Sequence, residues 1–235
     1  VTVIDRSGAL ARFAVTGPKT PAVLDRVDVH QVQAMPSLGS TGLRWSDASI
    51  TVVRHDFCGP IGVEFIASPS TAISLWRALS AEKDGVKAEP AGRDAVNRRR
   101  IEGGIPWPPH EINEDVLPGE TGQLERAVSY HKGCYLGQEV VERMRSRGVV
   151  ARRLCGVIVD NDEAPSPGLP IVDAQGQAVG TVGSVCRSLS LDAIIGLAYV
   201  KTGVDKPGTQ LATSVGGETV TLTVTALPFV PPASP

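Results

Sequence analysis

Hydrophobic and polar positions in the first 150 residues predict a mixture of short strands and helices. Three short runs of alternating or continuous apolar residues are typical of strands; they cover residues 12–15, 49–53 and 62–67. Between and after these runs, the apolar residues recur at helical spacing. Residues 1–150 are therefore expected to form an α+β region.

Capping residues predict where the first two helices begin. Thr20 as N-cap and Pro21 at the first helical position open a short helix over residues 20–27. Ser70 is the expected N-cap of a second helix. Five apolar residues of this helix share one face: Ala72, Ile73, Leu75, Trp76 and Leu79.

Two further helices flank a long irregular segment. Helices are predicted for residues 94–101 and 137–147, with Gly148 as the C-terminal stop of the second. Residues 105–130 carry Pro and Glu without a regular pattern. A loop of this length is uncommon in a compact domain and often has a function.

From Leu154 onward the pattern contains strands and turns only. The predicted strands are residues 154–159, 169–172, 178–186, 193–200, 211–214 and 219–226. Turn signals such as Gln175-Gly176 and Gly216-Gly217 join them. Short strands at this spacing favour a small antiparallel barrel or sandwich. We place this second domain at residues 151–235.

Composition and charge exclude several classes of protein. The 235 residues are 42% hydrophobic and 20% charged, and the formal net charge of −2 argues against wholesale electrostatic capture of nucleic acid. The apolar run at residues 193–200 is shorter than the ~18 residues of a membrane span, so no membrane partner is expected. No signal peptide opens the chain, and its start at Val1 indicates a processed or trimmed form. We expect a cytoplasmic protein, or an organelle-matrix protein in a eukaryote, and favour a monomer.

The four cysteines do not form a recognisable disulfide or metal framework. Cys58, Cys134, Cys155 and Cys186 are far apart, and no C-x-x-C pair occurs. His55 and Cys58 have a spacing seen in metal sites, but no second close pair completes four ligands. We therefore expect reduced cysteines and no bound metal.

The densest group of chemically informative residues is the segment from Lys132 to Glu139. Gly133 and Gly137 flank Cys134 and allow a tight turn or a close approach to a ligand. The N-terminus of the following helix and the neighbouring Lys132 favour a thiolate. The alternative is that Cys134 is a small buried apolar residue.

This segment resembles the signature of the YgfZ family, folate-binding proteins related to the glycine cleavage T-protein that act in the maturation or repair of iron–sulfur enzymes. The matching positions run from Lys132 to Glu139 and continue through Val140, Val141, Arg143 and Arg147-Gly148. Further landmarks occur in the family's order: Val15-Thr16-Gly17-Pro18, Gly62-Val63-Glu64, residues 100–106 and Leu227-Pro228-Phe229.

The resemblance implies a fold, a cofactor and partners. The fold is a T-protein-like α+β region followed by a small C-terminal antiparallel β-barrel, the cofactor is tetrahydrofolate, and the partners are iron–sulfur client enzymes. Cys134 is the expected catalytic sulfur. Folate contacts are expected from Glu64, Arg100, Lys132, Gly133, Tyr135, Gly137, Gln138, Glu139 and Arg143.

Two other functions remain open at this point. The T-protein branch shares the Gly-x-Glu and Arg-x-Glu-x-Gly regions but has no cysteine in its counterpart of the lysine–glycine motif, so Cys134 favours the YgfZ-like branch. The rival is a tetrahydrofolate-dependent aminomethyltransferase. In the family, a segment carrying the transferases' catalytic acid precedes the Asp5-Arg6-Ser7 region, and we expect this chain to lack it. A docking module without folate binding is the third alternative, and whether the chain is an enzyme is left open.

Glu64 and Arg100 each have a second interpretation. A charge within a strand is costly unless it is paired, and the resemblance implies that Glu64 accepts adjacent N–H groups of a pterin ring. Alternatively Glu64 faces outward, because Val63 and Phe65 begin an alternating face. Arg100 ends a run of three arginines, which is either a folate contact or a solvated helix face.

The charges after the motif have local interpretations. Glu139 and Arg143 are spaced for an i,i+4 ion pair. A basic stretch, which is usually solvated surface but could meet an anionic tail or RNA, comprises Arg143, Arg145, Arg147, Arg152 and Arg153. Nucleic-acid contact is not otherwise indicated.

Overall fold

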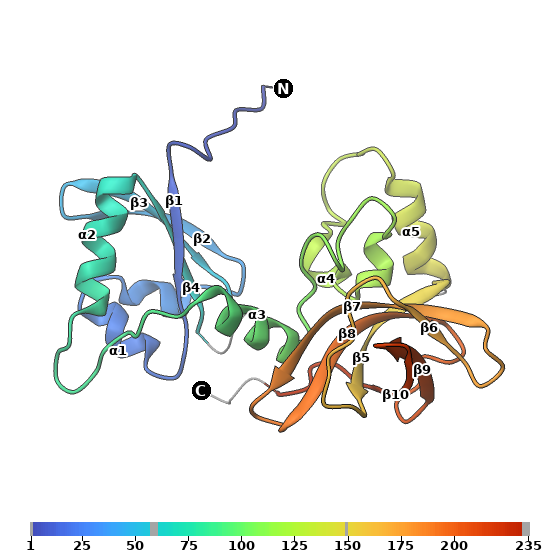
Figure 1. Ribbon diagram of the computed structural model, residues 1–235. Helices are drawn as coiled ribbons and strands as arrows, with labels where there is room; N and C mark the ends of the chain where they lie inside the picture. Colours follow the sequence, from blue (N-terminus) through green and yellow to red (C-terminus); the bar gives the residue numbers. More distant parts are fainter. Residues whose placement is uncertain (1, 57–60, 149, 232–235) are drawn as a thin grey trace. The chain divides into compact units, whose positions relative to one another are not determined.

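The computed structural model describes residues 2–56, 61–148 and 150–231, which form two compact units (Figure 1). The first unit extends to Val96 and the second covers Asn97–Pro231. Helix α3 (Arg93–Glu102) contains the boundary between them. None of the described helices is long and apolar enough to cross a membrane.

The first unit is built on a four-stranded antiparallel sheet in the order β1-β4-β3-β2. Its strands are β1 (Ala11–Val15), β2 (Ser40–Trp45), β3 (Ala48–Arg54) and β4 (Val63–Ala67). The predictions for β1, β3 and β4 are confirmed to within one residue at each end. No pattern predicted β2, an edge strand with Gly42 inside it and no fully buried residue.

The two faces of this sheet differ because successive residues of a strand point to opposite sides. Phe13, Val52 and Phe65 lie on one face, opposite one another across the strands. Helices on the same side complete this core (Figure 1); they are α1 (Thr20–Asp25), the 3-10 helix η1 (His30–Ala34) and α2 (Pro69–Ser80). The opposite face carries polar residues and holds one part of the candidate site.

Both predicted N-caps are wrong by one or two positions. Thr20 is already helical, and Lys19 occupies the N-cap position of α1. Ser68, not Ser70, caps α2 by accepting a hydrogen bond from the backbone N–H of Thr71 at 3.4 Å. The reason is Pro69, whose fixed φ suits the first helical position and leaves the cap to the residue before it.

The segment predicted to be irregular, residues 105–130, contains two short helices, η2 (Pro118–Thr121) and α4 (Leu124–Ala127). The helices predicted on either side of it are confirmed as α3 and α5 (Gln138–Arg147). As predicted, α5 ends at Gly148, which adopts a left-handed φ of +61°.

The second unit contains a closed antiparallel barrel in the order β10-β5-β8-β7-β6-β9, which confirms the predicted barrel (Figure 1). The strands are β5 (Arg152–Val159), β6 (Pro170–Val172), β7 (Ala178–Ser188), β8 (Ala193–Lys201), β9 (Gln210–Val215) and β10 (Glu218–Thr225). Alternate residues of these strands, among them Val157, Ala198 and Leu222, are buried together and form its core.

A bulge in β7 brings the barrel wall close to another segment. The register between β7 and β8 shifts between Val182 and Val185, which is the pattern of a β-bulge. A Cβ atom at Gly183 would lie 2.6 Å from Oε1 of Glu111 and 2.8 Å from the backbone oxygen of Leu197. Only glycine fits at this position without displacing its neighbours.

We expect Gly183→Ala to lower the free energy of unfolding by about 1–3 kcal/mol, because the added methyl overpacks a rigid contact. Gly42→Ala is the matched control, since a Cβ there meets nothing within 4 Å, and it should change stability little. Urea unfolding of both variants measures the difference. Equal stability of the two variants would contradict the close approach at Gly183.

Candidate functional site

Glu64 lies on the polar face of the first unit's sheet and has two hydrogen-bonded partners. It lies on the face opposite the core, as the outward-facing alternative expected, but it is only 5% exposed and is therefore not a solvated surface residue. Its Oε1 atom accepts a hydrogen bond from Nη2 of Arg12 at 2.8 Å and lies 2.8 Å from Nδ1 of His55. A carboxylate in the middle of a sheet is therefore paired from both sides, by a residue of β1 and by the residue that follows β3.

The same contacts control the ionisation of Glu64. Burial by itself raises the pKa of this carboxyl group, but the hydrogen bonds from His55 and Arg12 and the positive charge of Arg12 outweigh burial. The net effect lowers the pKa of Glu64 to about 2. Glu64 is therefore an anion at neutral pH, as a carboxylate that receives N–H donors must be.

Arg100 is buried in the second unit, so the solvated-face alternative is wrong for this residue. It is 3% exposed. Its guanidinium donates to Oδ1 of Asn97 at 2.8 Å, to the backbone oxygen of Ile105 at 3.1 Å, to Oε2 of Glu111 at 3.1 Å and to Oγ of Ser184 at 2.5 Å. Four N–H groups of Arg100 are thus used in hydrogen bonds within the second unit.

Glu111 completes this network from the long segment before α5. It is fully buried, and both its oxygens are occupied. Oε1 accepts from the backbone N–H of Ser184 at 2.5 Å, and Oε2 accepts from Arg100 and from the backbone N–H of Trp107. The pair therefore ties α3 and the segment around Trp107 to the bulge of β7.

The C-terminal end of α3 makes a second hydrogen-bonded contact with β7. The carboxylate of Glu102, 2% exposed, accepts from Oγ of Ser188 at 2.6 Å and from Arg99 at 2.7 Å. Its backbone oxygen accepts from the N–H of Phe229. Two sequence landmarks, the segment beginning at Arg100 and the closing Leu227-Pro228-Phe229, thus lie together in the fold.

The Lys132–Glu139 motif forms an exposed turn before α5. Gly137 occupies the N-cap position with a φ of +86°, and Oε1 of Gln138 accepts from the backbone N–H of Tyr135 at 3.3 Å. The ammonium group of Lys132 lies 4.7 Å from the centre of the Tyr135 ring, a cation–π contact. On the helix, Arg143 and Glu139 form the predicted i,i+4 ion pair at 2.5 Å.

The cysteines differ in exposure. Cys134 is exposed, so the interpretation of Cys134 as a buried apolar residue is wrong. Burial raises the pKa of the Cys155 and Cys186 thiols to about 11. Cys58, with its predicted metal spacing to His55, lies outside the described residues. Among those that are described, no group of three or more potential metal ligands occurs.

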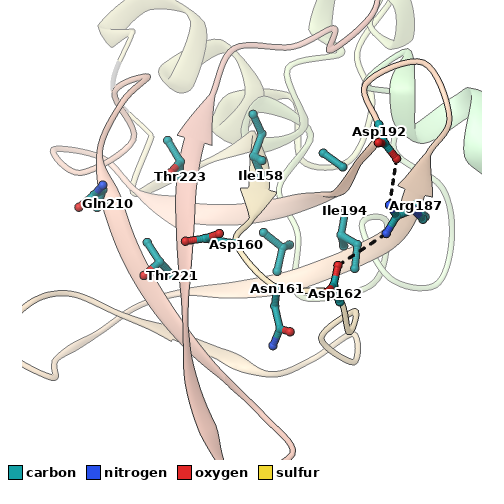
Figure 2. Close-up of a pocket in the computed structure, with 12 residues that line it drawn as sticks. Ile158, Asp160, Asn161, Asp162, Arg187, Asp192, Ile194, Gln210, Thr221 and Thr223 are labelled. Carbon is teal, nitrogen blue, oxygen red and sulfur yellow. Dashed lines mark hydrogen bonds and ion pairs between the residues drawn. The ribbon is translucent and has the colours of Figure 1, made fainter.

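A separate hollow of about 520 Å³ lies on the barrel (Figure 2). Its lining mixes aliphatic residues such as Ile158 and Ile194 with polar ones such as Thr221 and Thr223 of β10. Nη2 of Arg187, another lining residue, donates to Oδ1 of Asp192 at 2.9 Å. The described residues that line it include no aromatic side chain and none of the predicted folate contacts. The hollow therefore does not match a site for a planar ring.

The structure groups the predicted residues into three places. Glu64 belongs to the first unit, Arg100 to the buried network of the second, and residues 132–143 to the exposed turn and α5. No sequence pattern predicted the partners of the first two: Arg12 and His55 for Glu64, and Glu111 and Ser184 for Arg100. The signal available for Glu111 was the unusual length of the segment that contains it.

We expect Arg100→Leu to lower the free energy of unfolding by about 3–5 kcal/mol, because it leaves Glu111 buried without its cation. The double variant Arg100→Leu/Glu111→Gln should recover part of this loss, since the introduced amide carries no charge and its oxygen can still accept from the N–H of Ser184. Urea unfolding of both variants and of Glu111→Gln gives the coupling. Additive effects would show that the two charges do not interact.

Comparisons with known proteins agree with this architecture. The family model described as the GCVT N-terminal domain matches residues 1–132, and that of the glycine cleavage T-protein C-terminal barrel domain matches residues 152–231. The aminomethyltransferase of Halothermothrix orenii is 28% identical over 228 residues, which cover 97% of this chain and 63% of that protein. The aminomethyltransferase of Moorella thermoacetica is 31% identical over 237 residues, which cover 97% of this chain and 62% of that protein.

The fold is also that of a solved relative. Glycine cleavage system aminomethyltransferase T from Bartonella henselae matches 95% of this chain and 60% of its own chain, with a TM-score of 0.78 at 22% identity. The chain thus spans less than two thirds of the length of each of these relatives. Because one family model covers more than half of the residues and the second covers the barrel, the chain belongs to the glycine cleavage T-protein family.

Proposed function

We propose that this chain binds tetrahydrofolate and that Glu64 receives the pterin ring. The observation that carries the proposal is the buried carboxylate of Glu64, kept ionised within a strand by two donors. A pterin edge offers adjacent N–H donors, and hydrogen bonds to a carboxylate are stronger than those to a neutral acceptor. Glu64 also occupies the Gly-x-Glu position that resembles the family's folate contact.

Arg100 has a different role in this proposal. Its guanidinium is occupied by Glu111, Ser184 and two other acceptors, so we infer that it acts by holding the fold of the second unit. Its variant tests stability rather than direct folate contact.

We further propose that the protein is of the YgfZ type and assists the assembly or repair of iron–sulfur clusters in client enzymes, directly or through a folate-linked one-carbon step. The exposed Cys134, within a turn that Gly137 and Gln138 shape, supports this choice. An accessible thiol before a helix N-terminus is the arrangement expected for reactive sulfur. The remaining motif residues would form the turn and the adjacent surface.

A tetrahydrofolate-dependent aminomethyltransferase is the second candidate, favoured by the names of the similar proteins. The two candidates differ in what Cys134 does. If Cys134→Ser transfers the aminomethyl group from a lipoyl carrier at the wild-type rate, the transferase is favoured. If support of iron–sulfur enzymes requires Cys134, the first candidate is favoured.

Calorimetric titration with 5-formyltetrahydrofolate tests the folate site. We expect wild type to bind and Glu64→Gln to bind about tenfold more weakly or worse, because a hydrogen bond to a charged group is worth about 1.5–3 kcal/mol. Glu89→Gln is the control, since Glu89 is a surface residue of the same unit that pairs with Lys87. Equal affinities of all three proteins would contradict the assignment of Glu64.

Limited alkylation tests the accessible sulfur. After a brief, limiting dose of iodoacetamide at neutral pH, peptide mapping should find Cys134 modified before Cys155 and Cys186, whose thiol pKa values burial raises to about 11. Cys134→Ser should also fail to restore iron–sulfur enzyme activity in cells lacking the native protein. Labelling of Cys155 or Cys186 at the same rate, with full complementation by the serine variant, would make the motif structural.

A further inference from the structure

We propose that Arg12 and His55 are positioning residues for Glu64: they hold its carboxylate through Oε1 and leave Oε2 for an N–H donor of the ligand. This inference rests on the proposed folate site and deepens it. It concerns residues outside the motifs that carry the family resemblance.

The strand register explains why these side chains meet. Glu64 of β4 lies directly opposite Ala14 of β1 and Val53 of β3. Arg12 is two residues before Ala14, and His55 is two residues after Val53. Residues two apart in a strand share a face, and diagonal neighbours on one face lie within reach of long side chains. The sheet therefore directs one donor at Glu64 from each side.

The hydrogen bonds divide the carboxylate into a held oxygen and an available one. Both partners contact Oε1 at 2.8 Å, and the two lone pairs of this oxygen suffice for two donors. In the part of the chain that the structure describes, no donor is directed at Oε2. Glu111, by contrast, has both oxygens occupied. Glu64 is thus fixed in orientation and retains acceptor capacity.

Other charges near Glu64 do not replace these two donors. Arg54 and Asp56, which flank His55, pair with each other at 3.6 Å between Nε and Oδ2. Arg54 also donates to the backbone oxygens of Gln33 and Met35, and Asp56 accepts from the N–H of Gly62 at the entrance to β4. Among the described residues, Arg12 and His55 are the side chains that hydrogen-bond to the Glu64 carboxylate.

Removing either donor should weaken folate binding without removing the ring contact itself. Arg12→Leu and His55→Leu should each lower the affinity for 5-formyltetrahydrofolate by roughly tenfold, the loss expected for one hydrogen bond to a charged group. Arg12→Lys and His55→Asn retain an N–H donor and should stay within about threefold of wild type. Arg44→Leu is the matched control, because Arg44 lies on β2 and donates a hydrogen bond to the backbone oxygen of Asp47 rather than to Glu64.

The pH profile separates positioning from general destabilisation. Since the pKa of Glu64 is about 2, its ionisation should not limit binding by wild type anywhere between pH 5 and 8. In Arg12→Leu/His55→Leu, burial still raises the pKa of Glu64 while the opposing donors are gone, so the variant-to-wild-type ratio of Kd should increase as the pH falls from 7 to 5. A structural role alone would give a ratio independent of pH.

A ligand-free measurement makes failure of this inference distinguishable from failure of the folate proposal. A carboxyl group with a depressed pKa stabilises the fold above its unfolded pKa near 4.5, and that stabilisation is lost as pH falls toward 2. The carboxyl resonance of Glu64, assigned with Glu64→Gln, should therefore titrate near 2 in wild type and higher in Arg12→Leu.

Each outcome has one meaning. Absence of folate binding by wild type overturns the proposed function and with it this role. Binding by wild type with unchanged affinity and pH profile in both leucine variants overturns only the positioning role. A pKa of Glu64 that is the same in Arg12→Leu as in wild type would also overturn only the positioning role. Weakened, pH-sensitive binding in the leucine variants, with near wild-type affinity in Arg12→Lys, supports the positioning role.

Discussion

The buried ion pair between Arg100 and Glu111 is the contact on which the second unit most depends. Neither charge can be buried alone without a large cost, so the chain around Trp107 must fold back until Glu111 reaches the guanidinium. The same carboxylate also accepts from the backbone of Ser184. This in turn requires glycine at position 183, because any side chain there would meet Glu111. One pair of charges therefore fixes a helix end, a long segment and a strand bulge.

Glu64 shows the same chemistry put to a different use. Both oxygens of Glu111 are consumed by the protein, whereas Glu64 is held through Oε1 by Arg12 and His55. A carboxylate with every lone pair engaged can only stabilise, while one that is ionised, oriented and partly unengaged can also bind. This difference separates Arg100, which we assign to the fold, from Glu64, which we assign to the ligand, although both belong to motifs of the same family.

The exposed turn from Lys132 to Glu139 adds an accessible thiol to this picture. Gly137 has a left-handed φ in this turn. The side chain of Gln138 accepts a hydrogen bond from the backbone of Tyr135, and Lys132 makes a cation–π contact with the Tyr135 ring. These contacts are local and leave Cys134 open to solvent. The matches establish the family membership of the chain, and the sulfur chemistry that we propose for Cys134 would distinguish it from the named transferases.

The sequence by itself determined what depends on neighbouring residues. Alternation and turn residues predicted the strands of β1, β3, β4 and the barrel, Gly148 predicted the end of α5, and the spacing of Glu139 and Arg143 predicted their ion pair. Only the tertiary structure decided the partners of Glu64 and Arg100. Arg12 and Glu64 are 52 residues apart, and Arg100 and Ser184 are 84 apart; strand register and a bulge, which local periodicity does not encode, bring them together.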